Sequence, residues 1–159
     1  MSSVQTGKPA PAITLLNHVD RKPTTLNSLK GKKVVLAFFP GAFTGVCTKE
    51  ACALQDSLAA FNAVNAAVLG VSVDSPFAQK GFADANKITF PFLSDFNREA
   101  TRAYGIELPS FAGMTGYTAA KRSVFVLDRD GIVRYTWVSD NPGVEPDYAA
   151  IKSALAAIP

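Results

Sequence analysis

Two cysteines and a threonine follow the most apolar stretch of this 159-residue chain. Thr44, Cys47 and Cys52 come after the run 34–40, which reads Val-Val-Leu-Ala-Phe-Phe-Pro. Such a run predicts a buried strand, and the spacing of the apolar residues after it predicts a helix. The first thiol therefore lies where a strand gives way to a helix, and the second lies a little over one turn further on. This arrangement indicates redox chemistry.

Cys47 is placed to act as a nucleophile. A thiol attacks only as the thiolate, which the unpaired N–H groups of a first helical turn or a neighbouring cation favour. Gly45 allows a close backbone approach, Thr44 offers a hydroxyl as a cap or partner, and Pro40 stiffens the end of the strand. Free cysteines are also common as small buried core residues. From position alone, a reactive and a structural Cys47 are equally open.

The rest of the chain predicts one α/β domain over residues 1–159, with a mixed central sheet flanked by helices. Strands are expected at 34–39, 67–73, 123–127 and 132–138, and helices at 48–64, from 75–76 onward, at 97–104 and at 147–157. The last two strands are joined by 128–131, where Gly131 suits a positive φ, so they should form an antiparallel hairpin. Residues 108–120 should form a loop that walls a pocket.

Composition excludes several classes of protein. A hydrophobic content of 48% with 18% charged residues predicts a compact globular domain. The net charge of +3 is too dispersed for a nucleic-acid surface. No apolar run approaches the roughly 20 residues of a membrane-spanning helix, and no secretory signal begins the chain. We therefore expect a cytoplasmic protein without nucleic-acid or membrane partners, in which two cysteines are free, catalytic or metal-bound.

Metal and hydrolase chemistry find little support. His18, the only histidine, is expected on the surface of a polar turn. A zinc site needs four ligands, which two cysteines and one remote histidine do not supply. A cysteine hydrolase would need His18 beside Cys47 together with an orienting partner that the sequence does not identify. No Gly-rich phosphate loop follows a strand. We expect no metal and no cofactor.

The segment from Pro40 to Cys47, Pro-Gly-Ala-Phe-Thr-Gly-Val-Cys, matches the Pro-x-x-x-Thr-x-x-Cys signature of the peroxiredoxins. The resemblance extends to residues 7–11, to the strand at 122–127 and to the turn at 130–131. It implies a thioredoxin-like fold of the peroxiredoxin type. It also implies a thiol-dependent peroxidase that reduces hydrogen peroxide and organic hydroperoxides without a cofactor.

The same resemblance implies roles for individual residues. Cys47 would be the peroxidatic cysteine, which attacks the O–O bond and becomes a sulfenic acid. Thr44 would hydrogen-bond the thiolate and the peroxide, and Pro40 would shield the sulfur. Arg122 would supply the cation, although an arginine at the start of a strand is most often solvated. Glu50 could orient that arginine, but a carboxylate in a first helical turn is also favourable by itself, so it stays outside the predicted site.

Cys52 separates the possible mechanisms. Its spacing from Cys47 resembles the peroxiredoxin Q group, or bacterioferritin comigratory proteins, in which the second cysteine resolves the sulfenic acid as an intramolecular disulfide that thioredoxin or a similar dithiol then reduces. The residues around Cys47 instead resemble the alkyl hydroperoxide reductase E branch, which needs no such partner. A one-cysteine peroxidase with a structural Cys52 and a redox-sensing switch therefore remain as alternatives.

Aromatic residues raise the question of assembly. The set Phe77, Phe82, Phe90, Phe92 and Phe96 is expected to pack mainly in the core. From the resemblance, Phe43, Phe77 and Phe111 could line a dimer contact near the active-site loops. The sequence leaves a monomer and a homodimer open.

Overall fold

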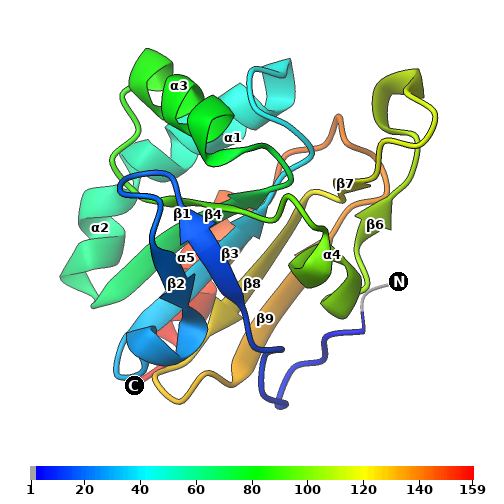
Figure 1. Ribbon diagram of the computed structural model, residues 1–159. Helices are drawn as coiled ribbons and strands as arrows, with labels where there is room; N and C mark the ends of the chain where they lie inside the picture. Colours follow the sequence, from blue (N-terminus) through cyan, green and yellow to red (C-terminus); the bar gives the residue numbers. More distant parts are fainter. Residues whose placement is uncertain (1–2) are drawn as a thin grey trace.

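The structure, a computed structural model, describes residues 3–159 and consists of a central sheet with helices on both faces (Figure 1). Its seven strands are β1 (Thr14–Asn17), β2 (Pro23–Thr25), β3 (Lys33–Phe38), β4 (Ala66–Ser72), β5 (Phe92–Ser94), β8 (Ser123–Leu127) and β9 (Val133–Val138), in the order β2-β1-β5-β4-β3-β8-β9. A second, two-stranded sheet pairs β6 (Glu107–Leu108) with β7 (Ala119–Ala120). The helices are α1 (Gly45–Asp56), α2 (Leu58–Ala63), α3 (Pro76–Asn86), α4 (Glu99–Ala103) and α5 (Tyr148–Ala156), with short 3-10 turns η1 (Leu26–Leu29) and η2 (Phe111–Gly113).

The sheet is mixed, as the sequence predicted. Strand β3 pairs in parallel with β4, and β4 pairs in parallel with β5. On its other side β3 pairs antiparallel with β8, which forms a hairpin with β9. Gly131 in that hairpin has φ +80, so the turn takes the conformation that glycine favours.

Strand β3 lies at the centre of the fold, and all six of its residues are buried. Because successive strand residues face opposite sides, the strand contributes to two cores. Val35 and Ala37 pack with α1, α2, α3 and α5, whereas Leu36 and Phe38 pack with α4 and the N-terminal segment. Cys47 belongs to the first of these cores. Cys47, near the start of α1, is therefore packed in the core between the sheet and these helices.

One of the predicted helices differs from the structure. The expected helix 48–64 begins earlier, at Gly45, and it breaks at Ser57 into α1 and α2. The Ser57 N–H donates to the carbonyls of both Ala53 and Leu54, which tightens the chain there and ends α1. The apolar periodicity continues through this break and so does not reveal it. At α3 the prediction is confirmed, since Ser75 caps the helix and Pro76 is its first residue.

Burial corrects two other predictions. Phe82, Phe90 and Phe92 are core residues, but Phe77 and Phe96 are 69% and 47% exposed. The predicted surface position of His18 is also wrong, because only 7% of that residue is exposed. The short strands β1, β2, β5, β6 and β7 were not predicted, since two to four residues carry too little periodicity.

The predicted loop 108–120 contains η2 and leads into β7, and it projects beside the start of α1 (Figure 1). Its Phe111 ring lies close to Gly41 in the loop that precedes α1. A Cβ atom added to Gly41 would be 3.5 Å from that ring. The loop therefore contacts the segment that carries the peroxiredoxin-like motif. Its role as the wall of a pocket stays a prediction.

Candidate active site

Cys47 is the third residue of α1, and 1% of it is exposed. Thr44 precedes the helix as its N-cap in an extended conformation, with φ −85 and ψ 152. The first N–H groups of a helix have no partner within it and favour negative charge nearby. Cys47 therefore lies, as predicted, in the first turn of a helix.

Arg122 lies directly beside this thiol. Its Nη2 donates to Cys47 Sγ at 3.2 Å, and its Nη1 donates to Glu50 Oε2 at 2.6 Å. The register of the sheet explains this placement, because Ser123 pairs with Phe38 at the end of β3 from which the chain continues to α1. The residue before β8 and the first turn of α1 consequently meet at one end of the sheet.

A backbone carbonyl completes the binding of the guanidinium. Pro142 O accepts from both Arg122 Nε, at 3.3 Å, and Arg122 Nη2, at 2.8 Å. With Glu50 and Cys47, it gives each guanidinium nitrogen a partner although only 1% of Arg122 is exposed. The planar donor fork of an arginine suits such a site better than a lysine would. The role of Pro142 had no signal in the sequence, since any residue supplies a carbonyl.

Burial and pairing together shift the pKa values of Glu50 and Arg122. It raises the pKa of Glu50 from 4.5 to about 7, although Arg122 acts in the opposite direction. Burial also acts to lower the pKa of Arg122, but Glu50 and Cys47 outweigh it and the pKa of the guanidinium rises. Glu50 Oε1 is buried and has no hydrogen-bond partner among the described residues. Glu50 is thus a site residue that the sequence left outside the prediction.

The loop before α1 has its own hydrogen bonds. Thr44 Oγ1 donates to Gly41 O at 2.9 Å, so its side chain makes no cap bond to the helix. The Ala42 N–H donates to Asp74 Oδ2 at 2.8 Å. Pro40, the first residue of the motif, is buried. The structure therefore places Thr44 and Pro40 in the loop next to Cys47, and it adds Asp74, which the sequence did not single out.

Cys52 lies five residues after Cys47 on the same helix, and it is half-buried. Both thiols are free. Five residues along an ideal helix separate Cα atoms by about 8 to 9 Å. A disulfide needs Cα atoms about 4.4 to 6.8 Å apart. The two cysteines can therefore join only if the first turns of α1 unwind.

His18 takes no part in this site. Its Nδ1 accepts the Phe92 N–H at 2.9 Å, and its ring packs on the Phe92 ring. Burial lowers the pKa of His18, which favours the neutral ring that this hydrogen bond requires.

Within residues 3–159, no group of three or more His, Cys, Asp and Glu side chains is arranged to hold a metal ion. No helix in that part of the chain is long and apolar enough to cross a membrane.

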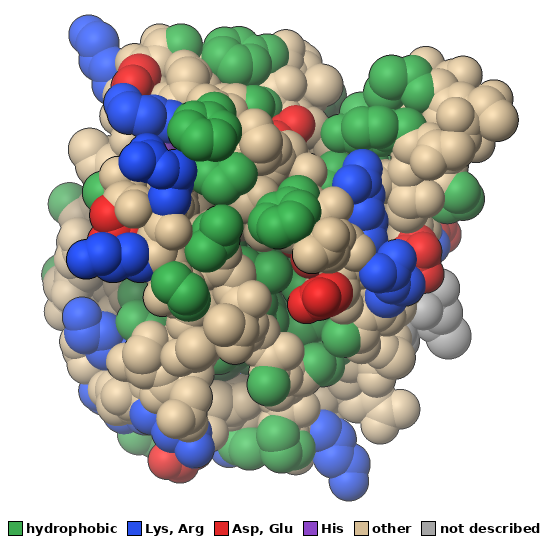
Figure 2. Space-filling model, viewed as in Figure 1, with side chains coloured by type: hydrophobic (Ala, Val, Ile, Leu, Met, Phe, Trp, Pro, Cys, Tyr) green, Lys and Arg blue, Asp and Glu red, His purple; other side chains and the backbone are tan. Residues whose placement is uncertain are grey.

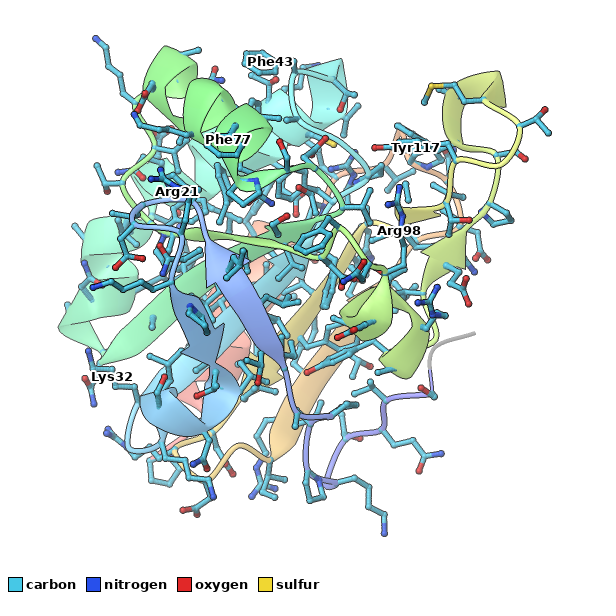
Figure 3. All side chains as sticks on the ribbon, in the orientation of Figure 1. Arg21, Lys32, Phe43, Phe77, Arg98 and Tyr117 are labelled. Carbon is cyan, nitrogen blue, oxygen red and sulfur yellow. The ribbon has the colours of Figure 1, made fainter. Side chains whose placement is uncertain are left out.

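Exposed aromatic residues lie on the surface near the site. Phe43, in the loop before α1, and Phe77, at the start of α3, are 62% and 69% exposed. Figure 3 shows Phe43 at the top of the molecule and Phe77 below it, and Figure 2 shows apolar side chains gathered on that face beside basic ones. Arg21 lies over the Phe77 ring, with its guanidinium carbon 5.4 Å from the ring centre. The opposite side of this face carries Arg98 over Tyr117, at 5.1 Å.

The chain is similar in sequence to known proteins. The chain matches the AhpC/TSA family over residues 6–136. It is 35% identical over 137 residues to a chloroplastic peroxiredoxin Q of Suaeda salsa, which covers 86% of this chain and 61% of that protein. It is 33% identical over 135 residues to a putative peroxiredoxin bcp of Coxiella burnetii, which covers 85% of this chain and 89% of that protein. The chain spans 59 to 61% of the length of several chloroplastic relatives.

Solved structures agree as well. The peroxidoxin BcpB of Mycobacterium tuberculosis superimposes with a TM-score of 0.85 at 29% identity, over 98% of this chain and 99% of that one. The AhpC of Mycobacterium tuberculosis gives a TM-score of 0.80 at 26% identity, over 97% of each chain. These matches confirm the predicted thioredoxin-like fold of the peroxiredoxin type.

Proposed function

The chain belongs to the AhpC/TSA family, and on that premise we propose that it is a thiol peroxidase that reduces hydrogen peroxide and organic hydroperoxides at Cys47. One observation carries this proposal: the Arg122 guanidinium donates to Cys47 Sγ at 3.2 Å in the first turn of a helix. A buried cation and a helix N-terminus both favour the thiolate, which is the attacking form.

In the first step the Cys47 thiolate attacks one oxygen of the hydroperoxide. An S–O bond forms as the O–O bond breaks, so the sulfur loses two electrons and becomes a sulfenic acid. The other oxygen takes the electron pair and a proton, and it leaves as water or an alcohol. Arg122 is fixed beforehand by Glu50 and Pro142, so its donors stabilise the developing negative charge without reorganising.

In the second step Cys52 attacks the sulfenic sulfur of Cys47, which forms a disulfide and releases water. The likeness to peroxiredoxin Q supports this assignment. The helical separation of the two thiols requires α1 to unwind locally during this step. Thioredoxin or a similar dithiol then reduces the disulfide by thiol–disulfide exchange. A one-cysteine cycle, in which an external thiol resolves Cys47, is the alternative mechanism.

We assign the protein to the cytoplasm, because two free thiols suit a reducing compartment. Several similar peroxiredoxins are chloroplastic by name, so the cytoplasmic assignment rests on the thiols of this chain and not on those relatives. The exposed rings of Phe43 and Phe77, together with Phe111, favour a homodimer over a monomer. A monomeric mass by light scattering at working concentration would contradict the dimer.

Turnover of hydroperoxide tests the proposed function. The chain is mixed with an excess of hydrogen peroxide, thioredoxin, thioredoxin reductase and NADPH, and NADPH consumption is followed. Many equivalents per chain are expected from the unchanged protein and none from Cys47→Ser. Consumption of a single equivalent would identify a redox-sensing switch instead. Full turnover by Cys52→Ser with thioredoxin would establish the one-cysteine cycle.

A further inference from the structure

The peptide unit that joins Gly41 to Ala42 is held at both of its polar atoms. Its carbonyl accepts from Thr44 Oγ1 at 2.9 Å, and its N–H donates to Asp74 Oδ2 at 2.8 Å. Asp74 lies two residues after β4, and its own carbonyl accepts from the buried Ser94 hydroxyl. A carboxylate on a rigid strand end thus fixes the plane of a peptide in the loop that leads to Cys47.

This peptide determines what Thr44 can offer a ligand. A hydroxyl carries one hydrogen and two lone pairs. Because Gly41 O takes the hydrogen, the Thr44 oxygen has only lone pairs left. A hydroperoxide carries one O–H donor, which such an oxygen can accept, while Arg122 is the nearby donor for oxygens. Thr44 and Arg122 therefore complement the two ends of an O–O–H group.

The backbone of the same loop is strained. Phe43, the next residue, has φ +63, a left-handed conformation that is uncommon for a bulky side chain. Such a residue persists only where its surroundings hold it. Most of the Phe43 ring is exposed, as Figure 3 shows at the top of the molecule, so packing against Phe82 covers only part of it. Polar anchors on the neighbouring peptide must supply the remaining restraint.

We propose that Asp74 is a positioning residue for the peroxide step. Through the Gly41–Ala42 peptide it sets the direction of the Thr44 hydroxyl hydrogen, and it thereby keeps the Thr44 oxygen as the acceptor for the hydroperoxide O–H. The proposal rests on the proposed peroxidase function. It predicts that loss of Asp74 slows the reaction with peroxide without changing the reactivity of the Cys47 thiolate itself.

The test compares two rate constants at Cys47 in Asp74→Ala and Asp74→Asn. Oxidation by hydrogen peroxide is followed by rapid-quench mass spectrometry, and alkylation by iodoacetamide is followed by peptide mapping. Iodoacetamide requires the thiolate but no acceptor from Thr44. Loss of a hydrogen bond to a charged group predicts a fall of about tenfold or more in the peroxide rate constant of Asp74→Ala, with alkylation within about twofold of the unchanged chain. Asp74→Asn keeps an acceptor oxygen and should retain most of the peroxide rate.

A second comparison asks whether Asp74 acts through Thr44. In a Thr44→Val background the hydroxyl is gone, so adding Asp74→Ala should cause little further loss of peroxide rate. Asp84→Ala, which removes an exposed carboxylate paired with Lys80 on α3, is the matched control and should react normally. Asp74→Ser, whose shorter side chain does not reach the Ala42 N–H, takes the place of Asp74→Ala if that variant does not fold.

The outcomes are distinct. An unchanged peroxide rate in Asp74→Ala, equal falls in oxidation and alkylation, or losses that multiply fully with Thr44→Val would each overturn the proposal. A large loss in Asp74→Asn would overturn it as well, because the acceptor oxygen is still present there. If the unchanged chain is alkylated at Cys47 but does not react with peroxide, the proposed function fails, and not merely the role of Asp74.

Discussion

Replacing Arg122 by lysine keeps the positive charge but removes the geometry that holds the site together. The guanidinium makes four hydrogen bonds, one to Glu50, one to Cys47 and two to the Pro142 carbonyl. A lysine ammonium is a single point of charge on a flexible stem and does not bind three separate groups in these directions. The shortest of the four bonds, at 2.6 Å, joins the carboxyl of Glu50, so we expect the ammonium to pair with that carboxyl and release the sulfur.

The size of the effect follows from the lost contact. A hydrogen bond to a charged group contributes about 1.5 to 3 kcal/mol. At about 1.4 kcal/mol for each factor of ten, the rate constant for oxidation of Cys47 should fall by about tenfold to 150-fold in Arg122→Lys. Because this loss includes stabilisation of the thiolate, alkylation of Cys47 by iodoacetamide should slow as well, and most strongly at low pH.

The assay measures both rate constants between pH 5 and pH 9 by rapid-quench mass spectrometry. Arg134→Lys is the matched control, since Arg134 is half-exposed and pairs with Asp128 at 2.7 Å away from the thiol. That variant should match the unchanged chain. Peroxide and alkylation rates for Arg122→Lys within about threefold of the unchanged chain, less than one lost charged hydrogen bond, would refute the assignment of Arg122 as the group that activates Cys47.

Three further predictions concern stability, measured by urea unfolding. Burial raises the pKa of Glu50 to about 7, so the folded state holds this proton more tightly than the unfolded state does. The unchanged chain should therefore lose stability relative to Glu50→Gln as the pH rises from 4.5 to 7, and parallel pH profiles of the two chains would contradict this. Burial lowers the pKa of His18, so the stability that its neutral ring provides should be lost as the pH falls below 6.5, and His18→Gln should not show this loss. An equal loss of stability at acid pH in both chains would exclude His18 as its cause. A Cβ at Gly70 would lie 2.4 Å from the Phe92 ring, so Gly70→Ala should lower the free energy of unfolding by about 1 to 3 kcal/mol. Gly45→Ala, with open space around the new Cβ, should not destabilise the fold, and equal stabilities of the two variants would show that Phe92 moves freely.

Long apolar runs made the centre of the fold predictable. Residues 34–39 and 67–73 were predicted as strands, and β3 and β4 match them to within one residue at each end. The hairpin after β8 was predictable because its turn residues leave few other conformations. The short edge strands β1 and β2 were not, since they form by pairing with each other and with β5 rather than from their own periodicity.

The site was predictable only in part. Cys47 and Thr44 follow from a local motif, but Arg122 is brought to them by the pairing of β3 with β8, across 75 residues of sequence. Resemblance to a family supplied that contact, and composition or spacing would not have done so. The Asp74 side chain contacts a backbone N–H, and Pro142 contributes its backbone carbonyl. Neither contact leaves a pattern of residue types in the sequence. Glu50 was noticed, but its burial against Arg122 is a property of the tertiary structure alone.

The central claim is that Cys47 is the thiol that hydroperoxide oxidises. Reduced protein is treated with one equivalent of hydrogen peroxide without added thiol, and its intact mass and peptide map are measured. Loss of two hydrogens, with Cys47 joined to Cys52, is the predicted result. An unchanged mass, or oxidation elsewhere while Cys47 remains a thiol, would contradict the account.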